Sequence, residues 1–243
     1  MSRFTVAPFL LLVLLTGPAA AEKLDLTPYF GPVPTVGDLR VFEFSTGNSR
    51  NFEVVEVSAW KNGFRYLTEI RPSGRRPILW PMTDVHEDFV IPGKKLLFGD
   101  RSRGGSFYDL KRPRTFAKFK VKLGRMNKIR AKATMSSSIE NFSGKAESEG
   151  GWIFVGLAPL DTPAASYADT AVVKRFLTTS VKSSMTGDVS AEVVERVVWR
   201  ACDLGEVAFH ERSRLYVNGG LHRDTGWIEA WLVGGSLAGQ PIP

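Results

Sequence analysis

Residues 116–133 read F-A-K-F-K-V-K-L-G-R-M-N-K-I-R-A-K-A. On either side of Gly124, basic and apolar side chains alternate along this stretch. Successive side chains of a β-strand point to opposite faces, so strict alternation is the pattern of a half-buried strand. A glycine near the middle allows the chain to turn. The stretch therefore predicts two amphipathic strands, with cations facing outward and apolar residues facing inward.

The two strands are expected to pair as a β-hairpin whose turn lies within residues 124–127. A loop with an odd number of residues keeps like faces together, whereas a shift by one residue would place charges in the core. Six cations would then lie on one face in three opposed pairs, which destabilise a sheet unless an anion screens them. The expected pairs are Lys122 with Lys128, Lys120 with Arg130, and Lys118 with Lys132.

Positive charge is concentrated around this hairpin rather than spread over the chain, whose formal net charge is +7. Between residues 94 and 132 there are 14 basic residues and only two acidic ones, Asp100 and Asp109. Such a cluster favours a surface that binds a polyanion. The alternative is a solvated outer face whose charge is neutralised by a neighbouring acidic strand. The candidates for that strand are Glu140, Glu147 and Glu149.

The rest of the chain also shows the signals of short strands separated by turns. Strands are expected at residues 39–45, 51–57 and 64–70, which would form an opening meander. The β-branched residues between Val189 and Trp199 favour another strand. A closing hairpin is expected around Asn218–Gly220, since Asn-Gly tolerates the positive φ that tight hairpins require.

One short helix is expected after residue 165. Ser166-x-x-Asp169 resembles a helix capping box, and Val172, Val173 and Phe176 follow at helical spacing. With this helix, the predicted fold class is mainly β. We expect an antiparallel curved sheet, arranged as a half-barrel or a sandwich.

The first 21 residues have the three parts of a cleavable secretory signal peptide. Arg3 supplies a positive charge, residues 9–15 an apolar core, and Ala19–Ala21 a small-residue cleavage site. That apolar core is shorter than the ~20 residues that span a bilayer, and no later stretch approaches this length. The mature protein is therefore expected to be periplasmic or secreted, without a transmembrane segment. We expect a signal peptide at 1–21, a single β-rich domain at 22–233 and a flexible tail at 234–243.

Two parts of the sequence resemble a group of uncharacterised exported bacterial envelope β-proteins. Leu26–Phe30 is an aromatic, proline-containing start of the mature chain, and Gly37–Val41 places a glycine before the first strand. Near the C-terminus, Cys202 and Asp203 replace the proline and glycine typical of that group. The resemblance implies an envelope location and a curved β-sheet, and it implies no activity. The C-terminal match is a degenerate W-x-A-x-x-x-G-x-V motif made by Trp199, Ala201, Gly205 and Val207.

Metal-binding and redox features are sparse. Two patterns, Asp84-x-His86 and His222-x-Asp224, place possible ligands two residues apart, on one face of a strand. Patterns of two residues arise often by chance, so no metal site is expected. Cys202 is the single cysteine, which excludes an internal disulfide.

No enzyme motif is complete. Ser58–Lys61 matches S-x-x-K but lies at a predicted strand end, and no K-T-G follows. Residues 234–238 nearly match the nucleophile elbow, but no aspartate and histidine follow the serine. No catalytic residue and no cofactor are therefore expected, and an enzyme is the less favoured class.

Aromatic residues fall in several predicted strands, where they form a core or line a groove for an acyl chain. Those residues are Trp152, Phe154, Trp199, Trp227 and Trp231.

The sequence thus predicts an exported, non-enzymatic protein that binds an anionic component of the cell envelope through the basic hairpin. The expected partners are an anionic lipid, lipopolysaccharide or an acidic polysaccharide, and not nucleic acid, because of the compartment. One alternative is a structural or assembly factor that binds an acidic protein. Another is a hydrolase with an unfamiliar site around Asp84 and His86. The predicted anion-binding residues are Lys118, Lys120, Lys122, Lys128, Arg130 and Lys132.

Overall fold

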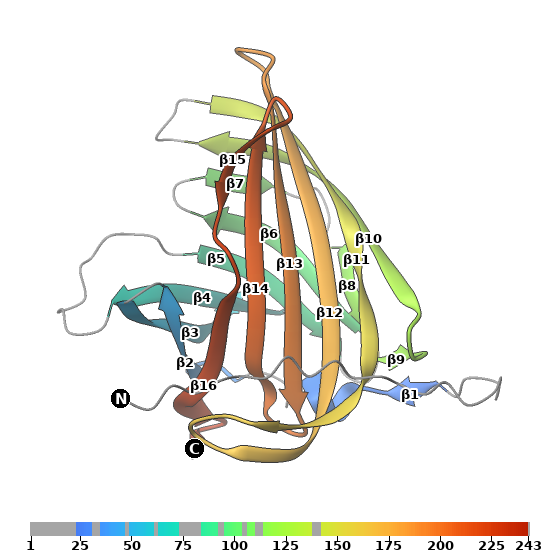
Figure 1. The fold of residues 1–243 in the computed structure, drawn as a ribbon, viewed down its shortest axis with the longest axis vertical. Coiled ribbons are helices and arrows are strands. Elements are labelled where there is room, and N and C mark those ends of the chain that lie inside the picture. The colour runs from blue at the N-terminus through green and yellow to red at the C-terminus, as the bar shows by residue number, and fades with distance from the viewer. Residues whose placement is uncertain are drawn as a thin grey trace.

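The computed structural model describes residues 23–30, 35–46, 49–60, 63–72, 84–91, 95–103, 106–109, 114–137 and 142–242 (Figure 1). The predicted signal peptide and Glu140 lie outside these ranges. The elements are β1 (Leu24–Asp25), η1 (Thr27–Phe30), β2 (Leu39–Thr46), β3 (Ser49–Trp60), β4 (Gly63–Pro72), β5 (Asp84–Ile91), β6 (Lys95–Arg103), β7 (Ser106–Asp109), β8 (Arg114–Lys118), β9 (Lys120–Val121), β10 (Met126–Ser137), β11 (Phe142–Asp161), β12 (Ser166–Ser183), β13 (Val189–Ala201), β14 (Gly205–Val217), β15 (Gly220–Asp224), β16 (Ile228–Leu237) and β17 (Gln240–Ile242).

Fifteen strands form one curved antiparallel sheet, as the sequence predicts for the fold class. Its strand order is β15-β14-β13-β12-β11-β10-β7-β6-β5-β4-β3-β2-β16-β17, and β8 pairs with β6. The start of β14 also pairs with β16, so the last long strands lie beside one another. In Figure 1 the long strands β11 to β14 run along the molecule in front, and β4 to β7 cross behind them. The separate pair β1–β9 lies at the lower side.

Several predicted strands are present with bounds close to those expected. The opening meander consists of β2, β3 and β4, which pair in sequence order. The segment rich in β-branched residues is β13. The expected turn at Asn218–Gly219 joins β14 to β15, with φ angles of 49° and 83° at its two central residues. These positive values explain why this turn uses Asn-Gly.

The predicted short helix is wrong, because Ser166–Ser183 forms the long strand β12. This strand pairs along its length with β11 on one side and β13 on the other. Its β-branched residues suit a pleated surface buried between neighbours, and this tertiary pairing outweighs the local capping signal. Asp169, the expected capping-box partner, instead accepts a hydrogen bond from the Tyr29 hydroxyl at 2.7 Å. Within the described residues the only helical element is the 3₁₀ turn η1.

The predicted flexible tail is also part of the sheet. Residues 234–237 continue β16, and residues 240–242 form β17, which pairs with the end of β16. Gly235 pairs with Arg40 of β2, and a Cβ atom at Gly235 would lie 2.0 Å from the Leu39 carbonyl oxygen. Glycine therefore allows β16 to approach β2 closely.

The segment Leu26–Phe30 packs against the turn between β13 and β14. The Asp203 amide donates to the Pro28 carbonyl at 2.9 Å, and the Tyr29 hydroxyl bonds to Asp169 at the start of β12. This hydrogen bond and burial raise the pKa of Tyr29 to about 12. The Leu26–Phe30 segment and the turn between β13 and β14, far apart in sequence, thus contact each other in space.

Among the described residues, buried apolar side chains form two clusters that pack against the sheet. One lies beneath β9, β10 and η1, and the other lies between β2, β14 and β16. The first consists of Leu26, Phe119, Val121, Ile129, Trp152, Phe154, Ala171 and Val173. The second consists of Phe42, Phe44, Val198, Ala201, Val207, Phe209, Ala230 and Leu232.

Candidate functional site

The two basic strands have the predicted faces but not the predicted partners. Phe119, Val121, Ile129 and Ala131 are buried, whereas Lys118, Lys120, Lys128, Arg130 and Lys132 are exposed. The predicted hairpin register is wrong: β9 pairs with β1, and β10 pairs with β11 and β7. A tight turn, closed by a hydrogen bond from the Arg125 amide to the Lys122 carbonyl, still connects β9 to β10. The strands therefore separate after the turn instead of opposing like charges.

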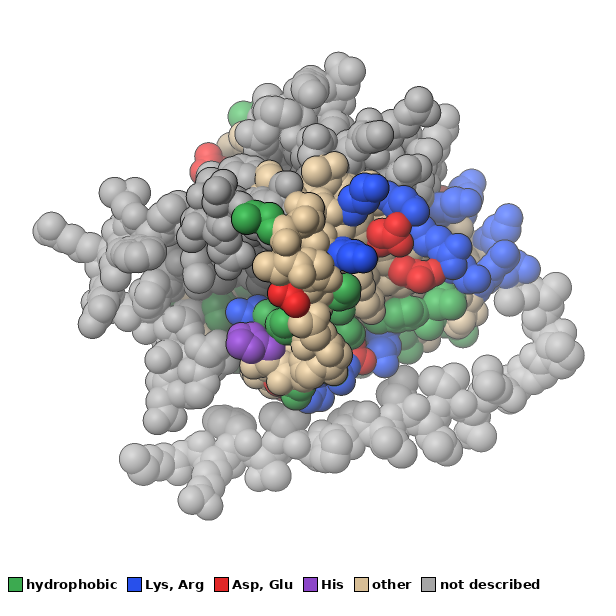
Figure 2. Space-filling view, turned by 90° about the horizontal axis from the view of Figure 1, so that it is seen from above, with side chains coloured by type: hydrophobic (Ala, Val, Ile, Leu, Met, Phe, Trp, Pro, Cys, Tyr) green, Lys and Arg blue, Asp and Glu red, His purple; other side chains and the backbone are tan. Residues whose placement is uncertain are grey.

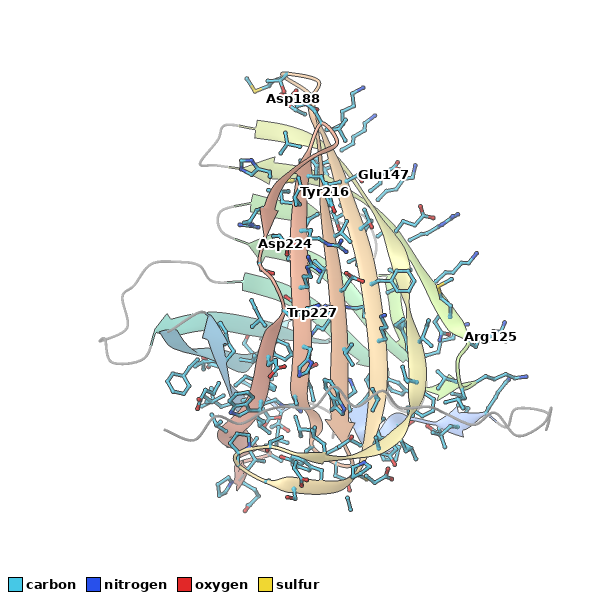
Figure 3. All side chains as sticks on the ribbon, viewed as in Figure 1. Arg125, Glu147, Asp188, Tyr216, Asp224 and Trp227 are labelled. Atoms are coloured by element: carbon cyan, nitrogen blue, oxygen red, sulfur yellow. The ribbon has the colours of Figure 1, made fainter. Side chains whose placement is uncertain are left out.

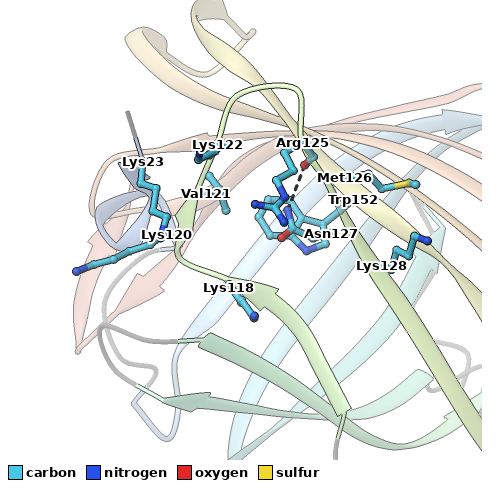
Figure 4. Close-up of a pocket in the computed structure, with 10 residues that line it drawn as sticks. All are labelled: Lys23, Lys118, Lys120, Val121, Lys122, Arg125, Met126, Asn127, Lys128 and Trp152. Carbon is cyan, nitrogen blue, oxygen red and sulfur yellow. Dashed lines mark hydrogen bonds between the residues drawn. The ribbon is translucent and has the colours of Figure 1, made fainter. Parts of the chain in front are cut away.

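A pocket of about 390 Å³ lies where the expected hairpin ladder would have been, between the β9 and β10 segments (Figure 4). Six of its ten described lining residues are cations, and none of the ten is a carboxylate. Four of these cations, Lys118, Lys120, Lys122 and Lys128, belong to the predicted anion-binding set. The lining residues are Lys23, Lys118, Lys120, Val121, Lys122, Arg125, Met126, Asn127, Lys128 and Trp152.

The apolar part of the lining belongs to the first core cluster. Trp152 is 1% exposed and lies opposite Asn127 in the β10–β11 ladder. Its indole Nε1 is buried and has no hydrogen-bond partner among the described residues. Buried indole N–H groups usually find an acceptor. Trp152 therefore combines a place in the pocket lining with a buried indole N–H that has no described partner.

An acidic residue lies beside one of these cations in β1. Asp25 lies opposite Lys120 across the β1–β9 pair. Its carboxylate accepts hydrogen bonds from the Thr27 amide at 2.9 Å and the Thr27 hydroxyl at 2.5 Å. These hydrogen bonds, with a smaller contribution from Lys120, lower the pKa of Asp25. The Asp25 carboxylate is thus engaged by its neighbour Thr27, and Asp25 is not among the described residues that line the pocket.

Arg130 and Lys132 are not among the described lining residues. Across the β10–β11 ladder they lie opposite Glu149 and Glu147, with N–O distances of 2.5 Å and 2.7 Å. The side chains of both pairs are more than 60% exposed. Hydrogen bonding to Lys132 lowers the pKa of Glu147. Neutralisation by an acidic strand therefore holds for these two cations (Figure 2, where acidic side chains lie among the Lys and Arg side chains).

Two pocket cations were not among the predicted site residues. Lys23 reaches the pocket because β1 pairs with β9, a contact between distant parts of the chain that local patterns do not reveal. Arg125 lies in the turn itself and interrupts the alternation, so it belongs to neither predicted strand face. The sequence did offer a signal for Arg125. Any turn that joins the two basic strands contains this residue and therefore places it beside their cations.

A second charged group lies farther along the sheet and is internally paired. Arg196 contacts both Glu206 and Glu211, the second at 3.0 Å, and Arg200 contacts Glu206 at 3.4 Å. Their side chains are between 15% and 23% exposed, and the Arg196 guanidinium lies 3.7 Å from the centre of the Phe209 ring. This half-buried network is built from side chains that satisfy one another.

The network sets the protonation of Glu206. Burial alone would raise the pKa of this carboxyl, but the guanidinium groups of Arg196 and Arg200 outweigh burial and lower it. Glu206 is therefore an anion in the folded protein at neutral pH. Its carboxylate compensates the half-buried cations of Arg196 and Arg200.

No cluster of three or more His, Cys, Asp or Glu side chains suited to a metal occurs in the described part of the chain. Asp224, from the pattern His222-x-Asp224, is bonded to Arg212 and to the Gly226 amide, which lower its pKa to about 2. The backbone of Asp84 and His86 lies in β5, and their side chains are not among those described. In the described ranges, no helix combines the length and apolar character needed to cross a membrane.

No protein-family model matches this sequence, and no curated protein matches it. Two solved structures show partial similarity. A protein from Bacteroides fragilis NCTC 9343, described as exported and as having a YMCC-like fold, gives a TM-score of 0.41 at 11% identity over 88% of this chain and 99% of its own. A protein from Parabacteroides distasonis ATCC 8503, described as a lipoprotein, gives a TM-score of 0.36 at 15% identity over 87% of this chain and 100% of its own. Neither similarity identifies a ligand or an activity.

Proposed function

We propose that this protein is an exported, non-enzymatic binding protein that takes an anionic group of the cell envelope into the pocket between β9 and β10. The candidate groups are a lipid headgroup, a phosphate of lipopolysaccharide and an acidic glycan, which share clustered phosphate or carboxylate oxygens. The predicted signal peptide supports a periplasmic or secreted location. The pocket replaces the flat hairpin face as the binding element.

One observation carries the proposal: six cations and no carboxylate among the described lining residues surround a pocket of about 390 Å³. Like charges brought together around a concave surface repel one another, and an anion relieves that repulsion. Lysine and arginine form charge-assisted hydrogen bonds with phosphate and carboxylate oxygens. The buried indole of Trp152 forms an apolar part of the same wall.

The contrast with Arg130 and Lys132 strengthens this assignment. Those two cations are paired with Glu149 and Glu147, whereas the described lining of the pocket offers its cations no acid. We therefore assign anion binding to the pocket cations and not to Arg130 and Lys132, which already have acidic partners. The pocket is also concave and small, which suits a compact anionic group better than the broad surface of an acidic protein.

Binding of inorganic tripolyphosphate, followed by calorimetry over a salt series, tests the proposal. We expect saturable binding that weakens by about tenfold or more between about 0.05 M and about 0.5 M sodium chloride, because salt screens the attraction. Phosphatidylglycerol vesicles, lipopolysaccharide and an acidic polysaccharide, measured in parallel, identify the preferred class. The absence of binding to all four probes at low salt would falsify the proposed function and leave an acidic protein as the partner to seek.

A further inference from the structure

We infer that the pocket binds the headgroups of an anionic phospholipid bilayer, and that aliphatic side chains beside the pocket enter the bilayer surface. This inference rests on the proposed function and names the source of the anion. It starts from an apolar patch, defined by Leu123, Met126, Val155 and Leu157.

The four side chains of the apolar patch are large, hydrophobic and exposed. Their exposed fractions are 50% for Leu123, 43% for Met126, 41% for Val155 and 44% for Leu157. The sequence alternation places Leu123 on the inner face with Val121, yet the turn directs it outward. Clustered exposed aliphatic groups on a protein surface mark an interaction site.

The turn that carries Leu123 lies against β11, which carries Val155 and Leu157. The Gly124 amide donates to the Phe154 carbonyl at 2.9 Å, which fixes the turn against β11. A Cβ at Gly156 would lie 3.9 Å from Leu123 Cδ1, so Leu123 lies beside the segment that carries Val155 and Leu157. Met126 begins β10 opposite Ile153 of β11. The backbone segments that carry the four residues therefore adjoin at one corner of the molecule.

The same corner carries the pocket cations. Lys122 and Arg125 flank Leu123 and Gly124 in the turn, and both line the pocket, as does Met126. Aliphatic groups next to lysine and arginine match the two layers of a bilayer surface, where acyl chains lie beneath anionic headgroups. A free anion would satisfy the cations but would leave the four aliphatic side chains in water. A bilayer satisfies both, and this complementarity selects it.

The opposite end of the long strands offers a matched control. Met185 is 71% exposed in the turn between β12 and β13, which also contains Asp188. Figure 3 shows Asp188 at the upper tip and Arg125 at the side of the molecule, far from one another. Exposed hydrophobic area alone would make Met185 a membrane contact as well, whereas the proposed docking surface excludes it.

The experiment measures co-sedimentation of the full mature chain with mixed phosphatidylglycerol–phosphatidylcholine vesicles. The test variant is Leu123→Ser/Val155→Ser, which changes two apolar-patch residues that do not line the pocket. The control variant is Met185→Ser. Calorimetry with tripolyphosphate is the second readout, and the thermal unfolding midpoint of each variant verifies folding.

We expect the Leu123→Ser/Val155→Ser variant to bind vesicles about tenfold or more weakly, because buried apolar area sets much of the affinity for a bilayer. Its affinity for tripolyphosphate should stay within about twofold of wild type, since the pocket cations are retained. Met185→Ser should match wild type with both probes. Vesicle binding equal to wild type in the double variant, or tripolyphosphate binding without vesicle binding in the wild type, would overturn the bilayer inference and leave the proposed function intact. If the wild type binds neither probe, the bilayer inference is overturned, and the proposed function falls with it when lipopolysaccharide and the acidic polysaccharide also fail to bind.

Discussion

Replacing Lys122 and Arg125 together by glutamine should weaken the binding of tripolyphosphate by about 100-fold. Both side chains line the pocket, and the turn holds them on one side of it. Each hydrogen bond from a cation to an anionic oxygen contributes about 1.5 kcal/mol or more, and 1.4 kcal/mol corresponds to tenfold in affinity. Glutamine retains hydrogen-bonding ability, so the variant removes the charge and shortens the side chain by only one or two atoms. Calorimetry at low salt gives the affinity directly.

The matched control is Arg130→Gln/Lys132→Gln. It removes the same two charges from the neighbouring strand, where both cations are paired with glutamates and do not line the pocket. If binding depends on the pocket, the affinity of the control variant for tripolyphosphate should stay within about threefold of wild type. A change of that size is what the loss of distant, exposed charges produces. Equal losses in the two variants would mean that net charge governs binding, and the pocket would lose its assigned role.

The second large effect is expected on stability. Glu206→Gln should lower the free energy of unfolding by about 3 kcal/mol, because it leaves half-buried guanidinium groups with too little compensation. In this variant Arg200 loses its ion pair with Glu206, while Arg196 keeps its ion pair with Glu211 at 3.0 Å. Urea unfolding followed by circular dichroism measures the change. Glu147→Gln, which breaks the exposed pair with Lys132, should leave the urea midpoint close to wild type.

The same residue predicts a pH dependence with a definite sign. The pKa of Glu206 is lower in the folded protein than its ordinary value, so its contribution to stability is complete above the unfolded pKa of about 4.3. That contribution is lost as the pH falls through the folded pKa. Stability of the wild type should therefore decline in acid, and Glu206→Gln should show a shallower decline. An identical acid dependence in the two proteins would contradict the assigned charge state.

The sequence predicted the faces of the basic strands because alternation is a local property. Phe119 and Ile129 are buried and Lys120 and Arg130 are exposed, as a period of two requires. The pairing was not predictable in the same way, because it depends on which distant strand competes for each edge. The acidic strand around Glu147 and Glu149 offers β10 opposite charges, whereas β9 would offer it only further cations.

The predicted helix failed for a related reason. The capping-box pattern at Ser166 is a local preference, and Ser166–Ser183 is held as a strand by ladders on both edges. The pocket depends even more on tertiary structure. Lys23 and Trp152 meet the basic residues only through β1–β9 and β10–β11 pairing, so no pattern within either segment reveals them. What the sequence did provide was four of the six pocket cations.

The most direct test of the central claim is to locate the bound anion, with the indole of Trp152 as the reporter. The protein contains six tryptophans, and labelling with 5-fluorotryptophan gives each of them a ¹⁹F resonance. The resonance that disappears in the Trp152→Phe variant belongs to Trp152. Trp152 lines the pocket, whereas Trp227 is 52% exposed and does not line it. On titration with tripolyphosphate, the pocket account predicts a saturable shift of the Trp152 resonance and an unmoved Trp227. Saturable binding that leaves Trp152 unchanged would place the anion elsewhere and contradict the account.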